Sequence, residues 1–261
     1  MNRMEWIGEE LAELPGRISC VCRNLVTGEH FEYHPEIPQN PASVIKLFVM
    51  AALYDAVARK EADPRRKIPV RREDCVPSCG VLTYLEEGWE VSLRDLAELM
   101  IIVSDNTACN LLMDTLGIPR IQAFVEGLGL RHTFVRRKMF DEEKAAAGIQ
   151  NETNAADVAW LLERIRKGEL IGREASADML ATLRHQRLNG KIPFLLHTLE
   201  PAPVIAHKTG EDSGVTHDVG IIEGEAPLLL CLMGTDTEVP PLERRMGEIA
   251  WRLYHQYPAR A

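Results

Sequence analysis

Strand-like sequence lies near both ends of this 261-residue chain and encloses a long helical stretch, and this order is what most restricts the fold. Apolar residues that alternate with polar ones predict strands, and turn residues such as Thr27-Gly28 and Gly224-Glu225 separate them. The predicted strands cover residues 17–25, 30–34, 203–209, 216–223 and 227–234. We therefore expect an α/β lobe from residues 1–40 and 202–261, and a helical lobe from residues 41–201.

Helical periodicity dominates the middle of the chain, where apolar residues recur every three or four positions. The predicted helices there cover residues 43–59, 92–102, 105–116, 119–128, 154–167 and 173–184. Each chain end adds another helix. An acidic amphipathic helix is predicted over residues 4–14, and Pro240-Pro241 begins a final helix that runs to about residue 256.

Charge and composition limit the partners. The formal net charge is −9, whereas binding to nucleic acid needs a basic face. The short basic runs at 65–67 and 71–72 fit solvated loops better than a binding surface. Hydrophobic residues make up 46% and charged residues 26%, which is ordinary for a globular enzyme, and no apolar stretch is long enough to span a membrane. We expect a monomer that acts on a small molecule, with no nucleic-acid or membrane partner.

The N-terminal helix and the cysteines bear on location. Residues 4–14 lack the basic and apolar regions of an export signal, so we expect a cytoplasmic protein; an exported chain whose leader has been removed is the alternative. Six cysteines without a small-disulfide-scaffold pattern also suit a reducing compartment. Cys75 and Cys79 could form a loop disulfide or half of a metal site. A second ligand pair with zinc-like spacing is missing from the sequence, which favours free thiols and no metal.

Three short motifs carry the candidate chemistry: Ser43-Val-Ile-Lys46, Ser104-Asp-Asn106 and Lys208-Thr-Gly210. Each is weak alone, since a Ser-x-x-Lys arises by chance about once in a chain of this length. In this order they supply a nucleophile beside an amine, a second hydroxyl beside an amide, and a cation on a strand. Those are the parts of a serine acyl-transfer site that uses lysine in place of histidine.

Each motif also has a purely structural interpretation. Ser43 could cap a helix whose Lys46 is exposed, but Lys46 stands among six apolar residues, where a solvated face is not expected. A lysine in such surroundings and near a second cation loses proton affinity and can act as a base. Ser104 fits a helix cap as well as a catalytic hydroxyl, and Lys208 fits an edge-strand charge that blocks further pairing.

The motifs and their spacing resemble those of class A β-lactamases and penicillin-binding proteins. Ser104 follows Ser43 by 61 residues, and Lys208 follows Ser104 by another 104. The resemblance covers nearly the whole chain and is weakest over about 134–152. It implies an antiparallel five-stranded sheet flanked by helices, next to an all-helical lobe, in a serine hydrolase without a cofactor.

The resemblance also implies the catalytic roles. Ser43 would be the acylated nucleophile and Lys46 its activating amine. The hydroxyl of Ser104 would relay a proton to the leaving nitrogen, while Asp105 would brace the turn. The backbone amides of Ser43 and Glu211 would form the oxyanion hole.

Substrate binding is implied for the remaining motif residues. Asn106 would bind the acyl-amide side chain of the substrate, and Lys208 and Thr209 would hold its carboxylate. Gly210 would let the ligand approach the backbone closely. His217 falls about where many class A enzymes carry a carboxylate-binding arginine; a structural histidine is the equally weighted alternative.

One loop departs from the family pattern. Class A β-lactamases carry a Glu-x-x-Leu-Asn element whose glutamate activates the deacylating water, and this element is absent between Thr133 and Thr153. Counting from Thr133 puts Met139 at the position of that glutamate. Glu142 and Glu143 are the nearest carboxylates, and a solvated charge pair is their simpler interpretation. The loop resembles that of class A-like penicillin-binding proteins, which are acylated readily and turn over slowly.

Three alternatives stay open or are weakened at this point. A D-alanyl-D-alanine peptidase or esterase fits the same motifs. A non-enzymatic β-lactam or peptidoglycan sensor fits the fold but normally needs a signalling segment. A Ser/His/Asp hydrolase is disfavoured, because the sequence has no Gly-x-Ser-x-Gly element and the neighbours His217 and Asp218 point to opposite faces of a strand.

Overall fold

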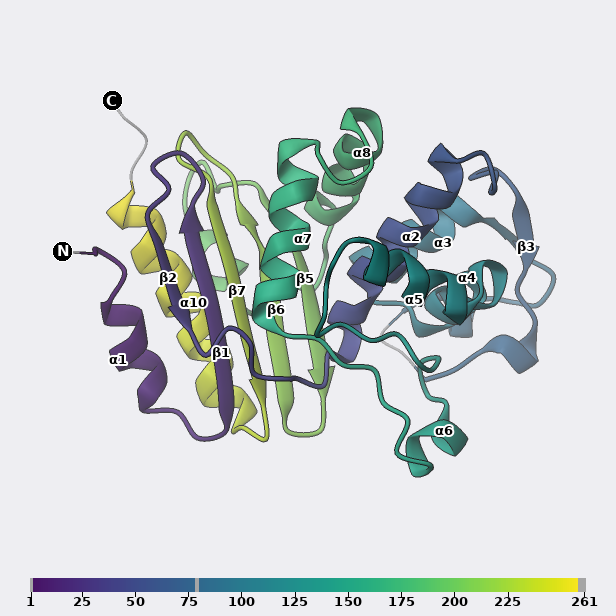
Figure 1. The fold of residues 1–261 in the computed structure, drawn as a ribbon, viewed down its shortest axis with the longest axis horizontal. Coiled ribbons are helices and arrows are strands. Elements are labelled where there is room, and N and C mark those ends of the chain that lie inside the picture. The colour runs from purple at the N-terminus through teal and green to yellow at the C-terminus, as the bar shows by residue number, and fades with distance from the viewer. Residues whose placement is uncertain (1, 78–79, 258–261) are drawn as a thin grey trace.

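An antiparallel sheet fills one half of the molecule and a group of helices fills the other (Figure 1). The computed structural model describes residues 2–77 and 80–257. The large sheet has the strand order β2-β1-β7-β6-β5. Its strands are β1 (Arg17–Asn24), β2 (His30–Tyr33), β5 (Ile205–Asp212), β6 (Val215–Ile222) and β7 (Leu228–Thr235). The predicted fold class, with a five-stranded antiparallel sheet beside a helical lobe, is therefore confirmed.

The two chain ends meet at the pairing of β1 with β7, where Cys20 lies opposite Leu232. Every residue of β6 and β7 is buried. A strand that is covered on both faces needs no alternation of polar and apolar residues, and β7 accordingly reads as a nearly continuous apolar run. The strand β5 pairs only with β6 in this sheet, so its other edge is open toward the helical lobe.

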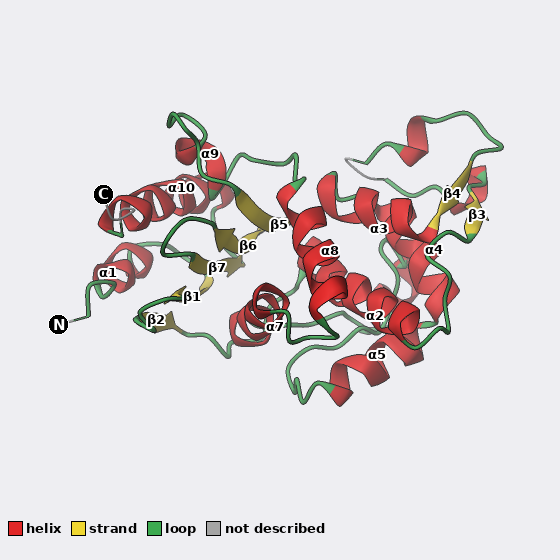
Figure 2. Ribbon diagram, turned by 90° about the horizontal axis from the view of Figure 1, so that it is seen from above, coloured by secondary structure: helices red, strands yellow, loops and turns green. Residues whose placement is uncertain are grey.

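Helices cover both faces of the sheet (Figure 2). The terminal helices α1 (Trp6–Ala12) and α10 (Val239–Gln256) lie on one face, together with the short helix α9 (Pro193–Leu196). Their apolar residues and those of the sheet form one core cluster. The opposite face is covered by α7 (Ala155–Lys167), which begins at the side-chain cap of Asn154 and ends at Gly168 in the left-handed conformation.

The helical lobe is built around α2 (Lys46–Ala58), most of whose residues are buried. A helix that is apolar on nearly every side is enclosed by others. The helices packed against α2 are α3 (Leu93–Ile102), α4 (Asn106–Leu116), α5 (Ile118–Gly127) and α8 (Arg173–Arg184). The short helix α6 (Glu142–Ala146) has no buried residue and lies apart from α2 (Figure 1). A small second sheet joins β3 (Lys67–Pro69) to β4 (Glu90–Ser92).

The structure differs from the predicted elements in a few places. The helix predicted from residue 43 begins with a 3₁₀ turn, η1 (Ala42–Ile45), before α2 starts at Lys46. Two more 3₁₀ turns, η2 (Arg72–Asp74) and η3 (Leu82–Tyr84), and the short helices α6 and α9 were not predicted. The division of the chain into lobes stays a prediction; α7 and α9 fall in the predicted helical lobe, yet both contact the other lobe.

The predictions on membrane spans, metal sites and cysteines can be compared with the described residues only. Within residues 2–77 and 80–257, none of the helices is long and apolar enough to cross a bilayer. In the same residues, His, Cys, Asp and Glu side chains do not gather into a group of three that could hold a metal. Cys75 forms no disulfide within the described residues, and Cys79 lies outside them, so the prediction that both are free thiols stays a prediction.

Candidate active site

The first motif places a hydroxyl beside a fully buried amine. Ser43 lies in η1 and Lys46 is the first residue of α2, so one helical turn separates them. Lys46 has no exposed surface, and its Nζ lies 2.9 Å from the Oγ of Ser43. Ser43 itself is partly exposed and lines a cleft, which leaves its hydroxyl open to a ligand.

Among the described residues, at least four oxygens lie within hydrogen-bond distance of the Lys46 nitrogen. Two are pure acceptors: the carbonyl of Ser104 at 2.7 Å and the Oδ1 of Asn106 at 2.6 Å. The other two are the hydroxyls of Ser43 and of Ser104, the latter at 3.0 Å. Two N–H groups can thus donate to the acceptors, and both hydroxyls lie within hydrogen-bond distance of the same nitrogen. In its neutral form the amine can direct a lone pair there and accept a proton from Ser43.

Ser104 links this amine to a second one. Its φ of 54° lies in the left-handed region, which costs a residue other than glycine about 1–3 kcal/mol and is concentrated at functional sites. The bond from Lys46 Nζ to its carbonyl helps to hold that conformation. Its Oγ also accepts a hydrogen bond from Lys208 Nζ at 3.0 Å. One hydroxyl therefore lies between two buried lysines.

The next two residues, Asp105 and Asn106, make different hydrogen bonds. Asp105 caps α4 by accepting from the Ala108 amide, and its other oxygen accepts from the amides of Val81 and Leu82. It therefore fixes a loop, as predicted, through backbone contacts. Asn106 accepts from Lys46 and donates from Nδ2 to the carbonyl of Pro77, and it lines the cleft.

The third motif lies inside the edge strand β5, which continues to Asp212 beyond the glycine where the strand was predicted to end. Lys208 is fully buried and also donates to the carbonyl of Thr209 at 2.7 Å. Gly210 packs directly against the turn that holds Ser43: a Cβ there would lie 3.1 Å from the Pro41 carbonyl oxygen and from a methyl of Val44. A side chain at this position would separate β5 from η1.

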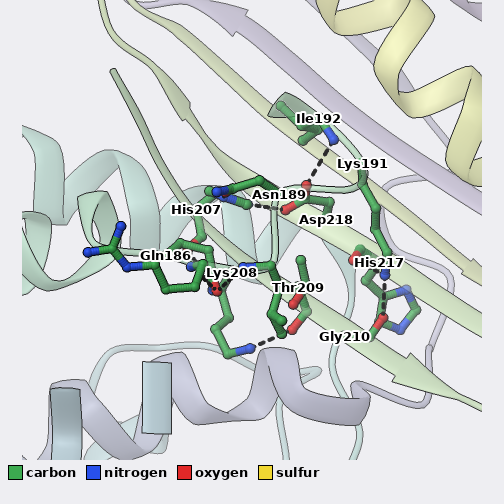
Figure 3. A network of polar contacts seen from close by, with 12 residues as sticks. Gln186, Asn189, Lys191, Ile192, His207, Lys208, Thr209, Gly210, His217 and Asp218 are labelled. Atoms are coloured by element: carbon green, nitrogen blue, oxygen red, sulfur yellow. Dashed lines mark hydrogen bonds and ion pairs between the residues drawn. The ribbon is translucent and has the colours of Figure 1, made fainter. Parts of the chain in front are cut away.

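The peptide group between Gly210 and Glu211 has a defined orientation. Lys191 Nζ donates to the carbonyls of Gly210 at 3.3 Å and of His217 at 3.2 Å (Figure 3). Gly210 and His217 are opposite residues of β5 and β6, and their carbonyls reach one ammonium group only if both point between the strands. Across a trans peptide the N–H points the other way, so the Glu211 N–H points out through the free edge of β5.

The prediction that His217 binds a carboxylate as a cation is wrong. Its ring is fully buried; Nε2 donates to the carbonyl of Asn40 at 2.7 Å, and Nδ1 accepts from the Gly234 amide at 3.1 Å. Burial lowers the pKa of His217 from 6.5 to about 4. The ring is therefore neutral near pH 7 and joins three segments. The structural interpretation of this histidine is the correct one.

The loop from Thr133 to Thr153 presents Met139 to the cleft. Asn110 holds the Met139 backbone from both sides: its Nδ2 donates to the carbonyl at 2.9 Å, and its Oδ1 accepts from the amide at 2.8 Å. Asn151 fixes the same loop by accepting from the amides of Arg136 and Arg137. The backbone of Met139 is thus fixed beside the cleft, and its correspondence to the glutamate of class A enzymes stays a prediction.

Glu142 and Glu143 are both exposed in α6. Glu142 lines the cleft, whereas Glu143 is absent from the residues that line it. The cleft has a volume of about 480 Å³ and brings together Ser43, Ser104, Asn106, Met139, Thr209 and Glu211. The carboxylates along it in the described part of the chain belong to Asp141, Glu142, Glu211 and Asp212.

Sequence reasoning missed the buried groups behind β5. His207 Nδ1 lies 2.8 Å from Asp218 Oδ1, and its Nε2 lies 3.0 Å from Asn189 Oδ1. Lys191 was missed as well. The register of β5 against β6 would have revealed the first pair, because Asp218 lies opposite Thr209, two residues from His207. The sequence carries no comparable signal for Lys191, which lies in a connection.

Comparisons with known proteins agree with this geometry. A model of the β-lactamase enzyme family matches residues 3–257. A β-lactamase of Rhodobacter capsulatus is 29% identical over 175 residues, which are 66% of this chain and 59% of that protein. β-Lactamase L2 of Stenotrophomonas maltophilia is 28% identical over 63% of this chain and 56% of its own length, so the aligned parts span less than two thirds of either relative.

Solved structures extend the similarity over almost the whole chain. A β-lactamase from Sphaerobacter thermophilus is 28% identical and superposes with a TM-score of 0.84 over 95% of this chain and 93% of that one. PBP-A, at 23% identity, superposes with a TM-score of 0.85 over 97% of this chain and 94% of its own, which shows a shared fold. Since the family model covers nearly every residue, this chain belongs to the β-lactamase enzyme family.

Proposed function

We propose that this protein is a serine hydrolase that is acylated at Ser43 by β-lactams and releases the acyl group slowly. The observation that carries the proposal is the buried line of contacts from Ser43 through Lys46 and Ser104 to Lys208. This line joins a nucleophile to two amines and a relay hydroxyl, which is what acyl transfer without histidine requires.

Acylation starts with the neutral amine of Lys46. Two ammonium groups beside one hydroxyl repel each other, which favours loss of a proton from one of them. As Ser43 Oγ attacks the lactam carbonyl carbon, its proton passes to Lys46. A proton is then delivered through Ser104 to the ring nitrogen as the C–N bond breaks. The product is an ester at Ser43 with the amine leaving group still tethered.

Charge that develops on the carbonyl oxygen needs donors in the cleft. The amide of Ser43 and the outward N–H of Glu211 belong to two segments that Gly210 allows to pack together. We assign the oxyanion hole to these two groups. Lys208 and Thr209 supply the positive charge and the hydroxyl for the substrate carboxylate, and Asn106 supplies an amide at the cleft for the acyl-amide side chain.

Deacylation needs a base that takes a proton from water while the water oxygen attacks the ester and Ser43 leaves with a proton. Met139 stands on the loop where that base would be, and a thioether cannot accept the proton. Glu142 lines the cleft and is the carboxylate that could substitute, although its exposure leaves it poorly positioned. We therefore assign the ester a long lifetime.

A D-alanyl peptidase or esterase activity is the second candidate, and the Met139 loop favours it, since a long-lived penicilloyl ester is how β-lactams inhibit such enzymes. One solved relative, a mutant of PBP-A, is an acyl-enzyme complex with penicillin G, and it is 23% identical to this chain. Hydrolysis of a D-Ala-D-Ala thioester, compared with that of a chromogenic cephalosporin, separates the two activities.

Penicillin labelling tests the proposal. Mass spectrometry of the tryptic digest should place one penicilloyl adduct on the peptide that contains Ser43, and Ser43→Ala should abolish it. Ser213→Ala, at an exposed turn between β5 and β6, is the matched control and should label like the unmodified protein. An adduct that persists in Ser43→Ala would refute the assignment of the nucleophile.

A further inference from the structure

Lys191 is a buried lysine to which the chemistry above gives no task. It lies in the connection between α8 and α9, and its side chain is only 3% exposed. Its Nζ contacts the carbonyls of Gly210 and His217, and the carboxylates of Glu211 at 3.0 Å and Glu243 at 3.4 Å. A buried ammonium needs such partners, because a charge taken out of water is costly unless it is paired and hydrogen-bonded. Two of the four partners are the carbonyls of facing residues on β5 and β6.

The segment around Lys191 is held in place from both sides (Figure 3). Two residues before it, Asn189 Oδ1 lies 3.0 Å from His207 Nε2 on β5. Directly after it, the Ile192 amide donates to Asp218 Oδ2 on β6 at 3.0 Å. The connection is thus fastened to the same two strands whose carbonyls the ammonium contacts. The cation is fixed with respect to β5 rather than free to move with solvent.

The Gly210 carbonyl and the Glu211 N–H belong to one peptide group. We propose that Lys191 is a positioning residue for acyl transfer: its ammonium orients and polarises this peptide, so that the Glu211 N–H is a stronger and better-aimed oxyanion donor. The inference rests on the proposed function, which assigns that N–H to the oxyanion hole.

The physical argument is that hydrogen-bonded groups in a low-dielectric interior polarise one another. A positive charge at the carbonyl oxygen draws electron density through the conjugated amide and leaves its hydrogen more positive. A donor fixed before the reaction also needs no reorganisation when charge develops on the substrate oxygen. Lys191 acts through the peptide and lies behind β5, so it is not expected to touch the substrate.

The two carboxylates define the competing explanation. Lys191 could serve only to compensate Glu211 and Glu243 or to hold the connection in place. In that case its loss would lower the free energy of unfolding but would leave the bound acyl carbonyl unchanged. The infrared stretching band of the ester carbonyl in the penicilloyl-enzyme separates the explanations, because stronger oxyanion donors shift that band to lower wavenumber.

The experiment compares the unmodified protein with Lys191→Met, Lys191→Arg and the control Glu243→Gln. For Lys191→Met we expect acylation at saturating penicillin to slow about ten-fold, less than the roughly 10²–10³-fold that loss of an oxyanion donor costs. The concentration for half-maximal acylation should change little, and the ester carbonyl band should move to higher wavenumber. Lys191→Arg should recover most of the acylation rate. Glu243→Gln should match the unmodified protein in both the acylation rate and the position of the ester carbonyl band.

The outcomes separate the inference from the function on which it rests. If the unmodified protein is not acylated at Ser43, the proposed function fails and the inference falls with it. If it is acylated, and folded Lys191→Met retains both the rate and the band position, the inference alone is overturned. Should Lys191→Met not fold, Lys191→Gln decides instead, because it keeps a donor but no charge: the same slowing and band shift support the polarisation, and unchanged values contradict it.

Discussion

Three buried lysines organise the site at the level of single residues. Lys46 and Lys208 have no exposed surface, and Lys191 is 3% exposed. Burying an ammonium is costly unless oxygens replace its hydration. Each of these cations meets backbone carbonyls, and Lys46 and Lys208 also meet hydroxyls. Lys46 and Lys208 both contact the hydroxyl of Ser104, which joins the two amines in one network.

His217 provides a prediction on stability and pH. Its folded-state pKa of about 4 lies below the unfolded value of 6.5, so the unfolded chain binds more protons between these limits. The contribution of the neutral His217 ring to the free energy of unfolding is therefore fully present above about pH 6.5. It is lost as the pH falls toward and through the folded-state pKa. Between pH 7.5 and 4.5 the unmodified protein should lose about 2–3 kcal/mol of unfolding free energy relative to His217→Gln.

Glutamine suits this comparison because it offers one donor and one acceptor without titrating. Urea unfolding of both proteins at the two pH values gives the difference. Carboxylates titrate equally in both proteins and cancel. Parallel loss of stability in the two would show that His217 is not held neutral.

Among the elements, β5 does most to assemble the site. One strand carries Thr209 to the cleft and Lys208 to the hydroxyl of Ser104, packs Gly210 on the turn that holds Ser43, and turns the Glu211 N–H outward. Its distance from β6 is set in part by Gly220, where a Cβ would lie 2.4 Å from both the Ala206 carbonyl oxygen and the His207 Cβ. The pairing leaves no room for a side chain there.

Gly220→Ala should therefore displace β5 from β6. Overpacking of this kind typically lowers the unfolding free energy by about 1–3 kcal/mol. Because the displaced strand carries Lys208 and Glu211, penicillin acylation should slow as well. Gly224→Ala is the matched control, since a Cβ there meets nothing within 4 Å. Denaturant unfolding and acylation rates that are equal in the two variants would contradict the assigned role of Gly220.

The elements also show what the sequence could predict. Long periodic segments such as α3, α4, α7 and α8 were predicted almost to their bounds, since their apolar faces recur over several turns. The helices α6 and α9 escaped because five and four residues are too few to establish a period. The end of β5 was placed too early, because a glycine was read as a terminus although it is a site of close packing.

At the scale of the whole molecule, contacts between site residues that are close in the sequence were the easiest to predict. Ser43 and Lys46 are three residues apart, so local helical geometry alone brings them together. Ser104 and Lys208 were located by motif, and only the folded lobes place both within reach of Lys46. The His207–Asp218 pair and Lys191 depend on strand register and on a connection, which composition and periodicity do not encode. The cationic role of His217 failed because burial could not be judged from sequence.

The proposed slow release of the acyl group belongs to the scale of the assembled molecule, because the cleft joins Ser43 of η1, Asn106 of α4 and Thr209 of β5 to the Met139 loop. In the proposed mechanism, acylation and deacylation depend on different segments, so the first step is expected to persist without the second. A carboxylate added to the Met139 loop should restore part of the deacylation rate. In Met139→Glu we expect faster release, with Met139→Gln as the matched control of similar size without a base.

Stopped-flow hydrolysis of a chromogenic cephalosporin tests the central claim most directly. A burst of about one product per enzyme should precede a slow steady state. If one positioned base is missing, deacylation should be slower than in efficient β-lactamases by about 10²–10⁴-fold. The steady-state rate should rise in Met139→Glu and stay low in Met139→Gln. Turnover of many molecules per second without a burst would contradict the account, since Glu142 or another group would then already serve as the base.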